Sequence, residues 1–220
     1  MTYLEEIADK GYTTIYNQDI VDYINGLSKN VEYVAEKSKE GDIFRCEHGI
    51  KQIQNLQDRV IYSALAYGLK ELIGKPDAKV LNMQYFIKYP GYKITSPHQD
   101  GFYFDAPDKK ILTFWIPLQD VEPNNSCLFY VPTSQLNGLL PHEKVGTKER
   151  TRTGKTGYSQ YCNFYEKHLF EAVPLKAGEI VVHDQFCVHY SSENKTDEKR
   201  VAVTCIMDVT PETPELKISI

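Results

Sequence analysis

The 220-residue sequence lacks the features that mark secreted, membrane or nucleic-acid-binding proteins. Its first residues contain neither a basic n-region nor an apolar h-region, and no apolar run is long enough to span a bilayer. The five cysteines are odd in number and include no C-x-x-C pair, which argues against a disulfide framework or a zinc knuckle. A net charge of −5 gives no general attraction to nucleic acid or anionic membranes. We therefore expect a soluble, cytoplasmic protein that binds neither nucleic acid nor membranes; the sequence does not indicate its oligomeric state.

Several catalytic motifs are also missing. The chain has no G-x-S-x-G elbow of serine hydrolases and neither of the glycine-rich loops that bind nucleotides. It contains no internal repeat, low-complexity tract or linker rich in proline, glycine or serine. We therefore predict a single domain over residues 1–220, a length that suits one β-rich domain with a sizeable core.

The order of the predicted elements indicates the fold class. Helical spacing of apolar residues predicts helices over 18–29 and about 53–73, within an N-terminal part of about 1–76. Short β-like runs separated by turns then occupy about 79–210; they are 80–89, 111–118, 127–131, 178–184 and 200–209. This order predicts a mainly β protein with flanking α structure, a β-barrel or jelly roll braced by N-terminal helices.

Residues 137–170 interrupt the series of strands. The segment is polar and rich in glycine, lysine, arginine and threonine, which predicts a long irregular loop that is either a lid or disordered. Its cations include Arg150 and Arg152. Such a charge run is usually a solvated face, and the alternative is a clamp for an anionic substrate.

The most informative pattern is His98-Gln99-Asp100 with a second histidine at His189. Side chains two apart on an extended segment point the same way, so His98 and Asp100 share a face. One distant histidine completes two imidazoles and one carboxylate, with the opposite coordination positions open. That ligand set is typical of non-haem Fe(II) oxygenases.

Two further residues bear on this site. His183 competes with His189 for the third position, although its place within a predicted strand favours a core histidine hydrogen-bonded near the metal. Arg200 heads an otherwise apolar run, and a buried cation needs an anionic partner. That partner is either an acidic side chain of the protein or the carboxylate of a co-substrate, gripped by the guanidinium fork.

On these residues the chain resembles the phytanoyl-CoA dioxygenase family of Fe(II)/2-oxoglutarate oxygenases. The resemblance runs from about Leu81 to Val209. Its most specific segments are HQDGFYF (98–104), the stretch LTFWIPLQDVEPNNSCLFYVPTSQLNGLLPH (112–142), GYSQ (157–160) and GEIVVHDQFCVHYSSENKTDEKR (178–200). It implies a double-stranded β-helix, or jelly roll, and a hydroxylase that converts 2-oxoglutarate and dioxygen to succinate and carbon dioxide.

The resemblance also implies roles for individual residues. Fe(II) would be held by His98, Asp100 and His189, with no catalytic side chain beyond these ligands. The 2-oxoglutarate would be bound by residues at five matching positions: Arg200, Ser191, Met83, Gln99 and Trp115. The presence of Asp100 disfavours halogenation, because iron halogenases replace this ligand with a small residue.

Aromatic residues beside the ligands are candidate walls of a substrate pocket, namely Tyr85, Phe102 and Tyr103. Core packing is the alternative for each. The natural substrate and the outcome of the reaction, whether hydroxylation, desaturation, cyclisation or epimerisation, cannot be predicted from the sequence. A non-catalytic metal-binding protein and a metalloenzyme that needs no keto acid remain the competing classes.

Overall fold

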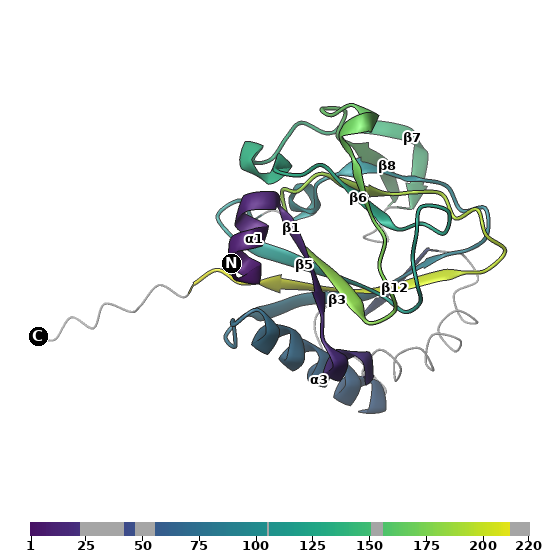
Figure 1. Ribbon diagram of the computed structural model, residues 1–220. Coiled ribbons are helices and arrows are strands. Elements are labelled where there is room, and N and C mark those ends of the chain that lie inside the picture. The colour runs from purple at the N-terminus through teal and green to yellow at the C-terminus, as the bar shows by residue number, and fades with distance from the viewer. Residues whose placement is uncertain (23–41, 47–55, 105, 151–155, 212–220) are drawn as a thin grey trace, which may run out of the picture.

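The computed structural model describes residues 1–22, 42–46, 56–104, 106–150 and 156–211. Its main strands form two antiparallel sheets that face each other as a jelly roll, as the sequence predicts (Figure 1). The six-stranded sheet runs β1 (Tyr12–Tyr16), β10 (Glu179–Asp184), β5 (Ile111–Pro117), β12 (Arg200–Asp208), β3 (Lys79–Lys88) and β2 (Asp42–Cys46). The four-stranded sheet runs β4 (Thr95–His98), β11 (His189–Ser191), β6 (Leu128–Tyr130) and β9 (Glu171–Val173).

A long helix, α3 (Leu56–Leu72), covers the outer face of the six-stranded sheet (Figure 1). Its fully buried Leu65 and Leu69 belong to one apolar cluster with Val203 and Cys205 of β12. The helix ends before Gly74, whose φ of +65° is a conformation that glycine adopts without strain. The predicted helix at about 53–73 is thereby confirmed over its described part.

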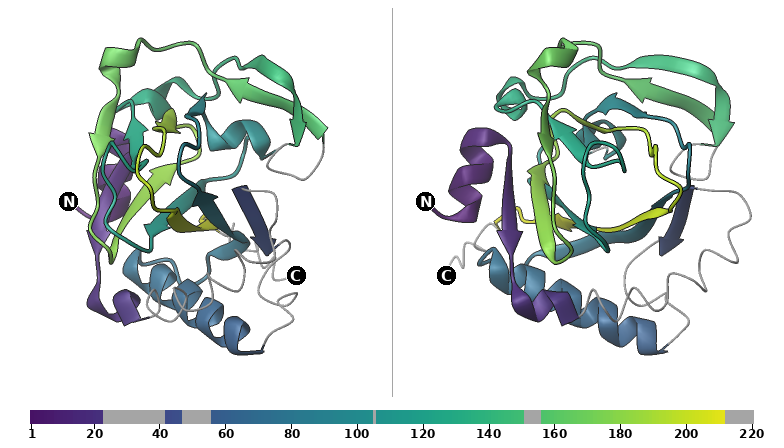
Figure 2. Two further views of the ribbon diagram at one scale, coloured as in Figure 1. Left: turned by 90° about the vertical axis from the view of Figure 1, so that its right-hand side faces the viewer. Right: turned by 45° about the vertical axis from the view of Figure 1, so that its right-hand side comes forward.

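The two faces of strand β12 pack against different parts of the protein. All nine of its residues are buried, so both faces are covered. Val201, Val203, Cys205 and Met207 pack in the cluster with α3. Because successive side chains alternate, Arg200 and its even-numbered neighbours face the interior between the two sheets. The right-hand view of Figure 2 shows the strands closing around this interior.

The N-terminal part is not purely helical, which corrects the sequence prediction. Helix α1 (Tyr3–Lys10) is followed by β1, which pairs with β10 at one edge of the six-stranded sheet, and β2 pairs with β3 at the other edge. Strands of five residues at a sheet edge carry too short a pattern to be read locally, because their pairing depends on tertiary contacts. Residues 18–22 are helical as predicted, and 23–29 lie outside the described residues.

The predicted irregular loop at 137–170 is also corrected. The segment begins at the end of η3 (Ser134–Asn137) and ends just after η4 (Lys167–Leu169). Between them, β7 (Glu143–Arg150) and β8 (Thr156–Tyr161) pair as an antiparallel ribbon. A two-stranded ribbon is held by backbone hydrogen bonds, which a polar composition does not reveal. β8 lies beside β4, and the amide of Cys162 donates to the carbonyl of Pro97 at 2.8 Å. Within the described part of the chain, no helix is long and apolar enough to cross a membrane.

Candidate metal centre

Three side chains capable of binding a metal meet in the interior. His98 ends β4 and His189 begins β11, and the two residues are cross-strand partners with ring centroids 4.4 Å apart. Asp100 opens the 3-10 turn η2 (Asp100–Tyr103) immediately beyond β4. One ligand atom from each of the three lies within 4.8 Å of the other two, and all three residues are buried. The structure thus brings together the triad that the sequence predicts.

The hydrogen bonds of the two imidazoles fix which ring nitrogen can bind a metal. Nδ1 of His98 lies 2.7 Å from the carbonyl oxygen of Ser96, and Nδ1 of His189 lies 3.0 Å from that of Cys187. A carbonyl only accepts, so Nδ1 carries the proton in both rings. Each Nε2 then presents a lone pair toward Oδ1 of Asp100, at 3.6 Å from His98 and 3.8 Å from His189.

The charges of the cluster also suit a metal. Burial opposes ionisation of Asp100, yet the hydrogen bond from His183 and the electrostatic attraction of the surrounding imidazoles outweigh it and hold the pKa of this carboxyl well below its usual value. Burial, followed by the charges of His98 and His183, holds the pKa of His189 well below its usual value. At neutral pH the site therefore offers a carboxylate and a neutral imidazole, the deprotonated forms that bind a metal.

His183 lies beside the triad, as the sequence analysis favoured. Its Nε2 is 3.1 Å from Oδ2 of Asp100, and its Nδ1 is 2.8 Å from the hydroxyl of Tyr130. Both ring nitrogens are therefore engaged, whereas Nε2 of His189 points at Oδ1. Oδ2 also accepts a hydrogen bond from the hydroxyl of Thr113 at 2.8 Å. The geometry supports His189, not His183, as the third ligand.

Arg200 is a buried cation whose hydrogen-bond partners among the described residues are all uncharged. Its residue is 2% exposed, its Nη1 donates to the carbonyl of Phe86 at 3.2 Å, and its Nη2 lies 3.5 Å from the Ser126 hydroxyl. In the described ranges no acidic side chain forms an ion pair with it, and its Nε has no hydrogen-bond partner. Burial lowers its pKa to about 10, so the guanidinium stays charged at neutral pH. The residues that the structure describes therefore give no support for a structural salt bridge to Arg200.

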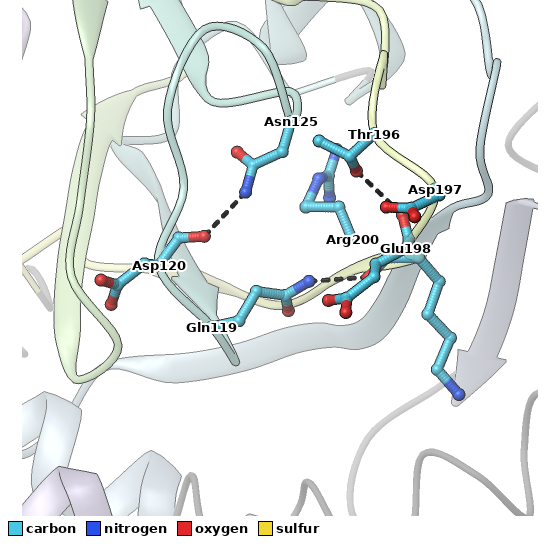
Figure 3. A pocket seen from close by; sticks show the side chains of 8 residues that line it. Gln119, Asp120, Asn125, Thr196, Asp197, Glu198 and Arg200 are labelled. Atoms are coloured by element: carbon cyan, nitrogen blue, oxygen red, sulfur yellow. Dashed lines mark hydrogen bonds between the residues drawn. The ribbon is translucent and has the colours of Figure 1, made fainter.

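A cavity of about 360 Å³ borders Arg200. Figure 3 shows the arginine between the segment that carries Asn125 and the turn that carries Thr196. The cavity is lined by Gln119, Asp120, Asn125, Thr196, Asp197, Glu198, Lys199 and Arg200. Three of these residues, Asp120, Asp197 and Glu198, are acidic, and none belongs to the triad.

Two other residues predicted to bind the co-substrate lie close to these groups. The ring of Trp115 is 5.3 Å from the guanidinium carbon of Arg200, a cation–π contact. Ser191 follows His189 by two residues on β11 and is buried. Alternation along the strand places its side chain on the same face as the imidazole of His189.

Three predicted site residues have other roles. Met83 and Tyr85 lie in the apolar cluster with α3, on the outer face of the six-stranded sheet, so the register of β3 turns them away from the interior. The side-chain amide of Gln99 donates to the carbonyls of Gly138 and Phe186 at 2.8 and 2.6 Å, and its oxygen accepts from the amide of Leu140 at 2.7 Å. With its hydrogen-bonding groups engaged by backbone, Gln99 anchors neighbouring segments, and its contact with the co-substrate stays a prediction.

The remaining candidates concern the substrate. Phe102 is 38% exposed and stacks on His142 with centroids 4.4 Å apart, and Tyr103 meets the ring of His98 edge-on at 6.0 Å. Both aromatic residues thus lie near the ligands, as expected. Arg150 ends β7, but its side chain and the whole of Arg152 lie outside the described residues.

Sequence reasoning missed Thr113 and Tyr130, which hold Asp100 and His183. Both lie on predicted strands, where a threonine or tyrosine is ordinary. Alternation along β5 gives one usable signal, because Thr113 and Trp115 share the interior face. The contact between Tyr130 and His183 joins the two sheets, and only the folded structure reveals it.

Comparison with known proteins gives a family match over most of the chain. The family model "Phytanoyl-CoA dioxygenase (PhyH)" matches residues 18–202. A Danio rerio protein, phytanoyl-CoA dioxygenase domain-containing protein 1, is 27% identical over 174 residues, which cover 76% of this chain and 57% of that protein. A phytanoyl-CoA dioxygenase of Arabidopsis thaliana is 26% identical over 168 residues, with the same coverage. The chain thus spans less than two thirds of the length of these two relatives.

Solved structures with the same architecture agree. EvdO2 from Micromonospora carbonacea var. aurantiaca superposes with a TM-score of 0.74 at 19% identity, covering 96% of this chain and 94% of that one. The epimerase SnoN, in complex with Fe3+, alpha ketoglutarate and nogalamycin RO, gives a TM-score of 0.66 at 21% identity, covering 94% and 82%. At these identities the likeness establishes the jelly-roll fold alone.

Proposed function

The chain belongs to the phytanoyl-CoA dioxygenase family, and from that premise we propose that it is an Fe(II)- and 2-oxoglutarate-dependent dioxygenase. The proposed reaction hydroxylates a small-molecule metabolite and releases succinate and carbon dioxide. The observation that carries the proposal is the pairing of two features in one interior. A buried two-histidine, one-carboxylate group faces it, and so does a buried guanidinium that has no counter-ion within the described part of the chain.

The triad fits Fe(II) by the chemistry of its donors. His98 and His189 would bind through Nε2, and Asp100 would bind through Oδ1, the oxygen that both Nε2 atoms face. Two neutral imidazoles and one carboxylate on one side leave the opposite coordination positions open. Iron bound there would supply the activation of dioxygen, coupled to oxidative decarboxylation of the keto acid.

Arg200 would anchor the distal carboxylate of 2-oxoglutarate. A guanidinium recognises a carboxylate through two parallel hydrogen bonds, and burial strengthens that pairing. The unpartnered Nε leaves donor capacity for an anion. Ser191 and Trp115 are the other proposed contacts, because one shares the face of His189 and the other touches Arg200.

For the substrate we propose a site beside Phe102 and Tyr103, which flank the ligands. Arg150 and Arg152 stay candidates for an anionic substrate group. The reaction outcome has a specific rival, because solved proteins of the same fold include an epimerase and a carbocyclase. Analysis of the organic product, alongside succinate, distinguishes hydroxylation from these outcomes.

The test is anaerobic addition of Fe(II), and then 2-oxoglutarate, to metal-free protein while visible absorption is followed. We expect a metal-to-ligand charge-transfer band that requires both additions. His98→Ala and Asp100→Ala should bind no iron. Arg200→Met should bind iron but weaken 2-oxoglutarate by about 2–5 kcal/mol, roughly 30-fold to several thousandfold, because it truncates a buried charge pair.

Lys199→Met is the matched control, since it removes the neighbouring cation, which also lines the cavity but is less buried than Arg200. It should give the wild-type band. Iron binding without any band would contradict the proposal and favour a keto-acid-independent or non-catalytic metal protein.

A further inference from the structure

The two oxygens of Asp100 have different surroundings. Oδ1 faces Nε2 of His98 and of His189. Oδ2 instead accepts hydrogen bonds from the Thr113 hydroxyl at 2.8 Å and from Nε2 of His183 at 3.1 Å. Both donors belong to the six-stranded sheet, on β5 and β10, whereas the imidazoles of the triad belong to the four-stranded sheet. The carboxylate is therefore held between the sheets by one oxygen while the other stays directed at the metal position.

Tyr130 determines which way His183 donates. A carboxylate only accepts, so Nε2 of His183 carries the proton that it shares with Asp100. In the tautomer with its proton on Nε2, the ring accepts at Nδ1, and the Tyr130 hydroxyl, 2.8 Å away, is the donor. With the hydroxyl removed, the ring could adopt the opposite tautomer, which would place a lone pair against the carboxylate.

The tyrosine is itself fixed in place. It is fully buried, and its ring stacks on Tyr12 at 4.5 Å and on the imidazole of His189 at 5.5 Å. Tyr12 is the cross-strand partner of His183. The pair of Tyr130 and His183 therefore has little freedom to reorient, as a group that positions a ligand requires.

We propose that Tyr130 and His183 are positioning residues that keep Asp100 a one-oxygen metal ligand. The inference rests on the proposed triad and deepens it. A carboxylate bound through both oxygens would occupy a coordination position that the triad otherwise leaves open for the keto acid and dioxygen. Hydrogen-bonded partners that orient metal ligands typically change metal affinity by about 10- to 100-fold when they are removed.

The experiment titrates metal-free protein with Co(II), whose visible d–d bands report both affinity and coordination number. We expect His183→Leu to weaken Co(II) binding by about 10- to 100-fold and to alter the band positions or intensity. His183→Gln should recover part of the affinity, because its amide can still donate to Oδ2. Tyr130→Phe, which deletes a single oxygen, should shift affinity and spectrum in the same direction as His183→Leu.

Tyr12→Phe is the matched control. It deletes the hydroxyl of the neighbouring buried ring, which bonds Glu171, and keeps the stack on Tyr130. It should bind Co(II) with the wild-type affinity and spectrum. The double variant Tyr130→Phe/His183→Leu should lose no more affinity than His183→Leu alone, because both act through one hydrogen-bonded unit.

The possible outcomes distinguish failure of the positioning role from failure of the metal centre and of the proposed function. Wild-type affinity and an unchanged spectrum in both His183→Leu and Tyr130→Phe would overturn the inference. Should His183→Leu fail to fold, Tyr130→Phe carries the test alone. Wild-type protein that binds no Co(II) would contradict the metal centre itself. A Co(II) site with no response to 2-oxoglutarate would contradict the proposed function while leaving the positioning role intact.

Discussion

The buried charge of Arg200 lowers the stability of the folded protein, although the proposed function needs it. Taking a charge out of water without a counter-ion is unfavourable, and its pKa of about 10 reflects that burial. We therefore expect Arg200→Met, besides losing 2-oxoglutarate binding, to keep or raise the unfolding free energy, by up to about 4 kcal/mol. Urea unfolding of the metal-free variant and wild type measures this. Clear destabilisation would mean that the guanidinium has an anionic partner within the protein.

The half-buried imidazole of His142 gives metal-free protein a pH-dependent stability. Burial lowers its pKa, and its Nε2 accepts a hydrogen bond from the amide of Gln99 at 3.1 Å. An unfolded histidine titrates near pH 6.5, so below that pH the unfolded chain binds a proton that the folded chain does not. Stability should therefore fall as the pH drops from about 7 toward 5.5.

Urea unfolding in the presence of a chelator measures this fall. His142→Gln keeps an acceptor for the amide of Gln99 but cannot titrate, so its stability should fall less than that of wild type. The lowered pKa of His189 acts in the same direction, which leaves a residual slope in the variant. An identical slope in both proteins would show that His142 does not contribute.

The individual ligands differ in how readily the sequence identifies them. His98 and Asp100 can be paired from the sequence because a spacing of two fixes their common face. Separating His189 from His183 needs the structure, because both are buried beside Asp100. The register decides between them: His189 lies opposite His98, whereas His183 lies opposite Thr113 on the other sheet.

At the scale of strands, alternation along β3 and β5 makes a sharp prediction. Met83 faces α3 and Trp115 faces Arg200. Met83→Leu conserves volume and should leave 2-oxoglutarate affinity unchanged, with a loss of stability below about 1.5 kcal/mol. Trp115→Leu should weaken the affinity, because it removes the ring beside the guanidinium. Titration of the charge-transfer band in both variants measures the affinity for 2-oxoglutarate. A weaker affinity in Met83→Leu but not in Trp115→Leu would contradict the assignment of Trp115 to the co-substrate site.

The elements with strong internal patterns are those that the sequence predicts. β3, β5, β6, β10 and β12 fall within two residues of their expected bounds, because their apolar runs are long and separated by turns. The short strands β4, β9 and β11 escape prediction, since no continuous apolar run marks them as one marks β6. The two strands that supply the metal-binding histidines belong to this group, so motif spacing located the site better than secondary-structure patterns did.

For the whole molecule, binding of a metal ion at the triad should raise the stability of the folded chain. An ion that binds only the folded chain should stabilise it by about 2.7 kcal/mol at a concentration 100 times its dissociation constant. Thermal unfolding with and without Co(II) should show a higher midpoint for wild type and no shift for His98→Ala. A shift of equal size in both proteins would place the ion elsewhere.

The overall architecture was predictable because its determinants are distributed along the chain. Helices followed by a series of strands, together with the family resemblance, indicate a jelly roll. The hairpin of β7 and β8 and the edge strands β1 and β2 were not predictable, because backbone pairing with distant partners defines them. The hydrogen bonds of Gln99 were hidden for the same reason: their acceptors and donor are backbone groups of segments far away in the sequence.

Because His98 lies opposite His189 on neighbouring strands, the complete ligand set forms only when β4 and β11 pair in the correct register. A slip of one residue between β4 and β11 would turn one imidazole to the opposite face of its sheet. Such a misaligned chain could keep its sheets and its compactness and still present only part of the ligand set. Stoichiometric uptake of one divalent ion per chain would then serve as an assay of correct strand alignment, useful for judging refolded or engineered preparations before any substrate is known.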